Sequence, residues 1–266
     1  MLLVFIPVFA VCFFSSVIGA ICGIGGGVII KPVLDALGVL PVSTINFLSG
    51  CTVLSMTTYS VLRSRISGAS QIDFKAATPL AIGAAIGGLV GKDLFSLVEG
   101  LFATPNTAGA VQAAVLMVIT FGTLIYTINK DKVATKQVTS AVACAVIGLF
   151  LGIMSSFLGI GGGPINLVVL YYFFSMETKE AAQNSLYIIL FSQAANTIRS
   201  VLTMDLASIS IGLIAGMVTC GILGGIAGRS VNKHIDAKRV DKLFIGLMVV
   251  IILINVYNIA KYTGLV

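Results

Sequence analysis

Eight apolar runs follow one another along this chain, each close to the roughly 20 residues that a helix needs to cross a bilayer. They occupy residues 3–22, 42–62, 76–97, 108–128, 138–158, 181–202, 206–227 and 243–259. Segments this long and continuous can span lipid only as helices, because no water is present there to satisfy the backbone. Only 10% of the residues are charged, against about 25% in a typical soluble domain. The chain is therefore predicted to be an all-α integral membrane protein.

The sequence GIGGG interrupts this pattern twice, at 23–27 and at 159–163, and a shorter apolar piece follows each time, at 28–40 and 164–174. Glycine permits backbone conformations closed to other residues and lets other groups approach the main chain. Unwound backbone in a bilayer is tolerated only where it is buried in protein or lines a wet cavity. We therefore expect a functional helix break at both positions, with close helix packing as the alternative. Neither stretch fits a dinucleotide fingerprint or a P-loop.

The two stretches are 136 residues apart, and the same shift places Ser49 on Ser185 and Arg63 on Arg199. A one-residue slip then places GGLVGK on GGIAGR. We interpret the chain as a tandem duplication, which is common in secondary transporters. The predicted parts are a first transmembrane repeat (1–129), a cytoplasmic linker (130–137) and a second transmembrane repeat (138–266).

Length and charge favour an inverted second repeat. One helix over residues 3–40 would be about 57 Å long, against a hydrocarbon core of about 30 Å. If each repeat instead begins with a hairpin that turns at GIGGG, three crossings remain, and an odd number inverts the next repeat. Twelve of the 16 Lys and Arg residues then share one side, and only Lys31, Lys92, Arg199 and Lys261 lie on the other. Positive charge collects in the cytoplasm.

The predicted fold is thus two inverted repeats, each a broken or re-entrant first helix plus three transmembrane helices. We expect a multi-pass protein of the cell membrane, a bacterial or archaeal plasma (inner) membrane, with both termini outside.

A central anion site is predicted where the two breaks would meet, because each is followed by a new helix whose free N–H groups and positive dipole end attract anions. No Asp, Glu or His lies deep in a full crossing, which argues against a cation substrate. The candidate substrate-binding residues lie at the breaks, in the second short helix and along the second and sixth runs. They are Gly25, Gly26, Gly27, Val28, Ser49, Thr57, Gly161, Gly162, Gly163, Asn166, Asn184, Ser185, Ser192, Gln193 and Asn196. For the side chains, interhelical hydrogen bonds without a ligand are the alternative. Asn184 lies off the polar face, where it could cap or face the hairpin.

Three cations are candidates for a mouth or gating role. Lys31 either snorkels to the interface or contacts the anion. Arg63 and Arg199 either draw anions to the two mouths or anchor helix ends. No catalytic residue, metal site or cofactor is expected, and the net charge of +6 is attributed to cytoplasmic loops and not to nucleic acid. The expected partners are a small anion and the lipid bilayer, with a coupled proton or ion and the oligomeric state left open.

With these features the chain resembles the TauE/SafE family, the sulfite exporter (TSUP) group of membrane transporters. The resemblance rests on GIGGG in both halves, Pro32 after the first, and the polar-then-apolar segments STINFLSG and AAQNSLYI, and it covers essentially the whole chain. It implies a secondary transporter, working as an exporter, for a small sulfur-containing anion such as sulfite or an organosulfonate. Alternating access around the central site, by one repeat rocking against the other, is the expected mechanism. A passive anion channel and a transporter of a non-sulfur carboxylate are the alternatives, and an enzyme is not expected.

Overall fold

The computed structural model describes residues 2–38, 40–102, 105–203 and 209–264, and all regular structure in these residues is helical. The α-helices are α1 (Leu2–Cys22), α2 (Gly27–Leu37), α3 (Val42–Ile66), α4 (Phe74–Leu101), α5 (Pro105–Asn129), α6 (Ala141–Phe157), α7 (Pro164–Phe174), α8 (Thr178–Thr203), α9 (Ile211–His234) and α10 (Ala237–Tyr262), with a 3-10 turn η1 (Lys130–Lys132) after α5. The prediction of an all-α chain is confirmed.

Six helices in the described part of the chain are long and apolar enough to cross a membrane: α1, α3, α4, α5, α9 and α10. Helix α8 is as long, at 26 residues, but is more polar and lies largely inside the bundle. Helix α6 is shorter than its predicted run, with 17 residues. The beginning of the predicted run 206–227 lies outside the described residues. The outer surface carries exposed apolar side chains such as Phe14, Val118 and Ile211, as expected of a lipid-facing perimeter.

Both GIGGG stretches interrupt helices, as predicted. The first break separates α1 from α2, and the second separates α6 from α7. Helix α7 begins at Pro164, whose missing N–H costs nothing in a first turn. Helix α2 begins at Gly27, and Pro32 lies inside it.

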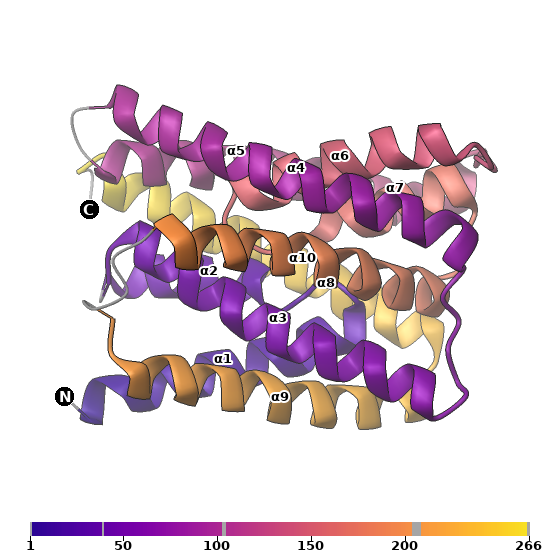
Figure 1. Ribbon diagram of the computed structural model, residues 1–266, viewed down its shortest axis with the longest axis horizontal. Helices are drawn as coiled ribbons and strands as arrows, with labels where there is room; N and C mark the ends of the chain where they lie inside the picture. The colour runs from indigo at the N-terminus through magenta and orange to yellow at the C-terminus, as the bar shows by residue number, and fades with distance from the viewer. Residues whose placement is uncertain (1, 39, 103–104, 204–208, 265–266) are drawn as a thin grey trace.

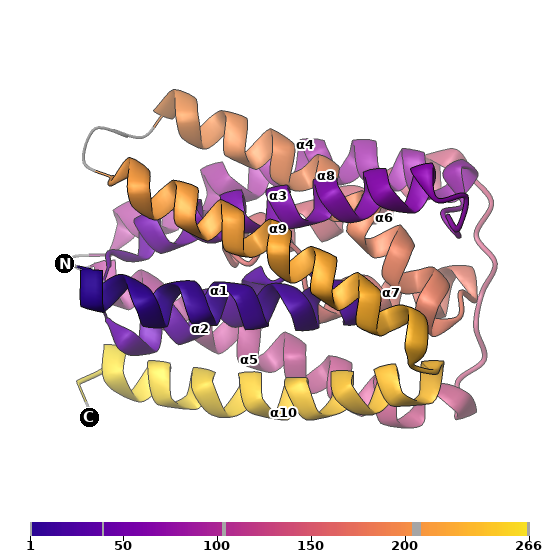
Figure 2. The ribbon, with the colours of Figure 1, turned by 90° about the horizontal axis from the view of Figure 1, so that it is seen from below.

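The bundle has two ends, and Figures 1 and 2 show that α1 begins and α10 ends at the same one. We call it the terminal end, and we call the opposite end, where residues 133–140 run, the linker end. Helix α2 returns to the terminal end, because the Lys261 ammonium near the end of α10 donates to the carbonyls of Asp35 and Ala36 at 3.1 and 2.8 Å. Helix α7 returns to the linker end, because the amide of Lys136 donates to the carbonyl of Tyr172 at 2.6 Å. Each broken helix is therefore folded back on itself.

The two hairpins pack across the repeat boundary. Helix α1 lies mainly against α9, and α6 lies mainly against α4 (Figure 1). Added methyl groups at Gly83, Gly87 and Gly91 of α4 would lie 2.0 to 2.4 Å from atoms of the α6 backbone. Methyl groups at Gly224 and Gly228 of α9 would lie 2.6 and 2.4 Å from carbonyl oxygens of α1. These two glycine faces are close-packing surfaces, of the kind that small residues form between membrane helices.

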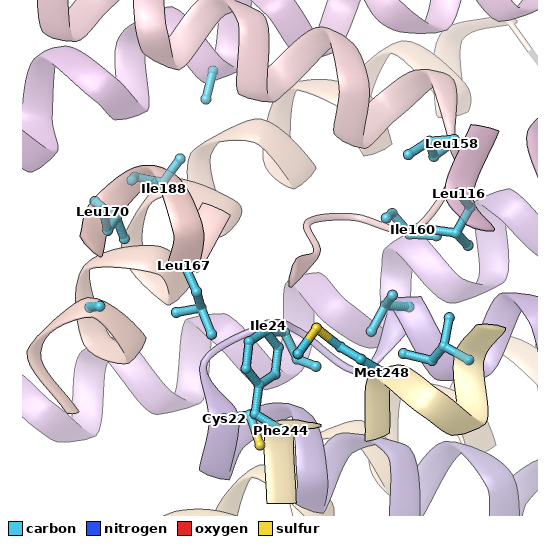
Figure 3. Close-up of a cluster of buried hydrophobic side chains, with 14 of the residues drawn as sticks. Cys22, Ile24, Leu116, Leu158, Ile160, Leu167, Leu170, Ile188, Phe244 and Met248 are labelled. Carbon is cyan, nitrogen blue, oxygen red and sulfur yellow. The ribbon is translucent and has the colours of Figure 1, made fainter. Parts of the chain in front are cut away.

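The isoleucine of each GIGGG stretch anchors its break in the apolar core. Ile24 and Ile160 occupy equivalent repeat positions and are 0% and 2% exposed. Both belong to one buried cluster, which also includes Leu116 of α5 and Met248 of α10 (Figure 3). The breaks are thus held inside the protein, where irregular backbone in a membrane is tolerated.

Candidate functional site

The two breaks share their backbone geometry at equivalent positions. Gly23 and Gly159 have φ of 75° and 66°, and Gly25 and Gly161 have φ of 70° and 71°. This left-handed region is open to glycine at little cost, which explains why both copies keep these residues. The copies then differ, because Gly162 has φ of 130° whereas its counterpart Gly26 is in the right-handed region.

The breaks touch each other. A methyl group added at Gly27 would lie 2.0 Å from the carbonyl oxygen of Ile160, and one added at Gly25 would lie 3.8 Å from the carbonyl oxygen of Gly161. Each break also packs on the other repeat, with Gly23 against Ala182 of α8 and Gly159 against Asn46 of α3. A 136-residue shift relates Asn46 to Ala182, so these two contacts are equivalent. The point of contact itself has no room for a solute, and any site must lie beside it.

Both breaks carry main-chain N–H groups for which the described part of the chain provides no acceptor. They belong to Gly25, Gly26, Gly27 and Val28 at the first break, and to Gly161, Gly162, Gly163 and Ile165 at the second. The first N–H groups of any helix lack an intrahelical partner, and the positive dipole end adds to their attraction for negative charge. Because the breaks touch, the two sets of free N–H groups lie close together, and such an arrangement is suited to binding an anion.

Buried hydroxyl and amide groups surround the breaks. Ser49 lies against Gly27, and the Gln193 amide lies against Gly161. Ser49, Ser185, Ser192, Asn166 and Gln193 are all at most 3% exposed, and each has a side-chain oxygen with no hydrogen-bond partner among the described residues. Such groups are rare in folded proteins. A serine hydroxyl can donate to an oxyanion, and so can the NH₂ of an amide.

A cavity of 230 Å³ adjoins the second break and extends toward the terminal end. Gly159, Asn46 and Asn196 line its inner part, and Lys92 of α4 lies beside them. The ammonium group of Lys92 donates to the hydroxyl of Ser200. The side-chain oxygens of Asn46 and Asn196 have no partner among the described residues. A cation, unpaired polar groups and one glycine break therefore lie around the same cavity.

A second cavity, of 110 Å³, lies beside the first break and extends toward the linker end. Ala20 and Ala182 line its inner part, and Arg229 of α9 lies beside Ser60 and Ser64 of α3. The repeat shift relates these residues to those of the first cavity: Asn196 matches Ser60, Ser200 matches Ser64 and, with the one-residue slip, Lys92 matches Arg229. The protein thus has two cavities at equivalent repeat positions, with Lys92 and Arg229 as the matching cations, and they extend toward opposite ends of the bundle.

Two predicted binding residues have other partners. The Thr57 hydroxyl donates to the carbonyls of Val53 and Leu54 in its own helix, at 2.8 and 3.1 Å. Asn184 neither caps nor faces the hairpin. Its amide donates to the carbonyl of Gln71 at 3.1 Å and its oxygen accepts from the amide of Asp73 at 3.0 Å, so it fixes the segment before α4. These bonds leave both side chains with a structural role.

The three predicted mouth cations have different surroundings. Lys31 does not snorkel, since its side chain is 3% exposed and forms an ion pair with Asp35 at 2.6 Å. Arg199 is paired with Asp93 at 3.1 Å on the surface, and Arg63 is exposed. None of the three lines either cavity. Lys92 lines the first cavity, and Arg229, which the repeat alignment places on it, lines the second together with Lys179 and Lys233.

Sequence reasoning also missed Asn46, Ser155 and Ser156. Asn46 contacts Gly159, and the hydroxyl groups of Ser155 and Ser156 are buried without partners near the end of α6. Asn46 is revealed only by the three-dimensional approach of the second break to α3. A pair of serines at a helix end next to GIGGG is the signal that could have found Ser155 and Ser156.

An all-helical fold with several membrane-spanning helices and two buried helix breaks defines a multi-pass integral membrane protein. A family model described as sulfite exporter TauE/SafE matches residues 8–254, and the chain belongs to this family. No curated protein and no solved structure matches the chain. The family is one of membrane transporters for sulfite and related sulfur anions, so the chain is assigned to transport and not to catalysis.

Proposed function

We propose that the protein is a secondary transporter that exports a small sulfur-containing anion such as sulfite or an organosulfonate. The observation that carries this proposal is the contact between the two glycine breaks, each with unpaired main-chain amides and each beside a cavity that extends to a different end. The anion would be bound next to the contact by amides of Gly25–Val28 and Gly161–Gly163. Ser49, Ser185, Ser192, Gln193, Asn166 and Asn196 would supply further hydrogen bonds.

The two repeats are proposed to be inverted, with residues 1–129 and 138–266 as the halves and 130–137 as a cytoplasmic linker. Two observations support this arrangement: both hairpins return to the end from which they started, and these are opposite ends. The positive-inside tendency makes the linker end cytoplasmic and the terminal end external.

Alternating access would open one cavity while the breaks close the other. We propose that the tight contact between Gly27 and Ile160 lies between the two cavities and closes the route from one to the other, as expected of a carrier and not of an open channel. The extensive packing of α1 on α9 and of α6 on α4 ties each hairpin to the opposite repeat. We therefore propose that the moving bodies combine helices of both repeats, a revision of the simple rocking of one repeat against the other.

The proposal is tested by transport into proteoliposomes containing the purified protein. Radiolabelled sulfite, thiosulfate, sulfoacetate and taurine are compared with a carboxylate such as acetate. We expect saturable uptake of at least one sulfur anion, accelerated by the same anion on the opposite side. Uptake that never saturates would identify a channel, and uptake of the carboxylate alone would refute the sulfur-anion assignment.

The topology is tested with single reporters fused after Lys132 and after the last residue. We expect the reporter after Lys132 to be cytoplasmic and the C-terminal reporter to be external. Two reporters on the same side would contradict an inverted second repeat, because the three crossings between them are an odd number.

A further inference from the structure

The two equivalent cavities differ in charge. The cavity at the linker end is lined by three cations, Lys179, Arg229 and Lys233, and by no acidic side chain. The cavity at the terminal end is lined by one cation, Lys92, and one acid, Glu99. The repeat symmetry accounts for Lys92 and Arg229, but it places Ser43 on Lys179 and, with the slip, Ser96 on Lys233. The extra positive charge therefore belongs to one end only.

Two of the three cations of the linker-end cavity, Arg229 and Lys179, are held by neutral groups. The guanidinium of Arg229 donates to the carbonyl of Ser60 at 3.2 Å and to the hydroxyl of Ser67 at 2.9 Å. Lys179 donates to the carbonyl of Asn232 at 3.0 Å. Among the described residues none of the three cations forms an ion pair with a carboxylate. Their positive charge is therefore not neutralised by an internal ion pair and can act on a solute.

Arg229 is also positioned to contact that solute directly. Its side chain lines the cavity. Its terminal nitrogens donate to groups at the end of α3, so the guanidinium is pre-oriented beside the cavity. A planar, always charged guanidinium is well suited to oxyanions. A concave site lined by one sign of charge also raises the local concentration of counter-ions and their rate of entry.

Building on the proposed function, we propose that the linker-end cavity is the anion-loading site of the transporter, with Arg229 as its anion-contact residue. Lys179 and Lys233 attract the oxyanion into the cavity. The terminal-end cavity is the weaker release site, in which Glu99 offsets the charge of Lys92. Since the linker end is proposed to be cytoplasmic, the asymmetry favours capture from the cytoplasm at low concentration and release outside.

The prediction is a difference in half-saturating concentration between the two sides. Initial rates of labelled sulfur-anion exchange are measured in right-side-out and inside-out vesicles, with the transported anion identified by the assay above. The KM is expected to be lower from the linker end. Loss of the charged hydrogen bond in Arg229→Gln should raise the linker-end KM by about tenfold and leave the terminal-end KM within twofold. Lys92→Gln should instead raise the terminal-end KM and leave the linker-end KM within twofold.

Further variants separate charge from folding. Lys233→Gln should raise the linker-end KM less than Arg229→Gln does, and the increase should disappear at high salt, where charge attraction is screened. Lys238→Gln, an exposed cation of the same end that lines neither cavity, is the matched control and should change nothing. Arg229→Cys can be modified at the new thiol with methanethiosulfonate reagents. A cationic reagent should lower the linker-end KM again, and an anionic reagent should not. Wild-type protein is treated in parallel as the control for its own cysteines.

The outcomes distinguish this inference from the proposed function. If wild-type protein moves no sulfur anion, the proposed function fails. If wild-type protein transports the anion but has equal KM values on the two sides, or if Arg229→Gln shifts both sides equally, the loading site is refuted while the transporter stands.

Discussion

Replacing Gly27 by alanine is expected to abolish transport and to lower the thermal stability of the protein. The added methyl group would lie 2.0 Å from the Ile160 carbonyl oxygen and 3.0 Å from the Ser49 hydroxyl. Backbone cannot move aside as a side-chain tip can, so the two breaks must separate. Forced overpacking in a core costs about 1–3 kcal/mol, and the displaced breaks would misplace the amides of both. We expect at least a tenfold loss of initial transport rate, since a misplacement of about 1 Å can cost 10²-fold.

Gly122→Ala in α5 is the matched control, because a methyl group there meets no atom within 4 Å. It should keep the wild-type rate and melting temperature, or gain slightly from the better helix propensity of alanine. Both variants are measured in parallel, with rates from proteoliposomes and melting followed by size-exclusion chromatography after heating. A Gly27→Ala protein that melts and transports like wild type would show that the breaks do not meet.

Removing the Asp35 carboxylate is expected to destabilise the protein more than any surface substitution. Lys31 and Asp35 form a buried ion pair in α2, with both side chains 3% exposed. Asp35→Leu would leave the Lys31 ammonium buried without its partner, at a cost of about 3–5 kcal/mol. Lys31→Leu should cost less, because the ammonium of Lys261 already lies 3.1 Å from the Asp35 carbonyl and can turn to the carboxylate.

The second repeat provides the compensating variant. The positions equivalent to Lys31 and Asp35 are Leu167 and Tyr171, both buried. The double substitution Lys31→Leu with Asp35→Tyr should therefore recover most of the melting temperature lost in Asp35→Leu, since replacing a whole buried pair by apolar residues is often neutral. Equal losses in the single and double variants would contradict this explanation and would point to a direct role of the charges in transport.

The sequence predicted the helices well because bilayer thickness fixes the length of a crossing and periodic apolar runs are unambiguous. The positions of both breaks also followed from local patterns. Helix α8 was recognised despite its polar residues, because most of its length is apolar and several of the polar residues share one helical face. What the sequence could not reveal was which helix each hairpin packs against, since this depends on contacts between residues far apart in the chain, such as Gly83 with Ala145 and Phe13 with Gly224.

The site residues divide in the same way, into those that the local sequence predicts and those that depend on the tertiary fold. Gly25 to Val28 and Gly161 to Gly163 do carry unpaired amides, as local backbone chemistry predicts. Thr57 was predicted from helical periodicity and Asn184 from its place near the start of its helix, and neither signal reveals that their hydrogen bonds are already made. Lys31 was considered as a lone cation, although Asp35 lies four residues later on the same helix face. Lys92 and Arg229 could be identified as candidates only once the structure had shown the cavities that they line.

Because each hairpin packs on helices of the other half, half of this chain would not be stable alone. In isolation, the first repeat would expose the glycine face of α4 to lipid, and its α1 would lack the α9 surface on which it packs. With the halves inverted as proposed above, a second copy inserted upside down would cover both surfaces, as an isologous pair about an axis in the membrane plane. A half-length protein with this pattern is therefore expected to exist as an antiparallel homodimer of dual orientation, and fusion of two copies through 130–137 makes that pairing intramolecular.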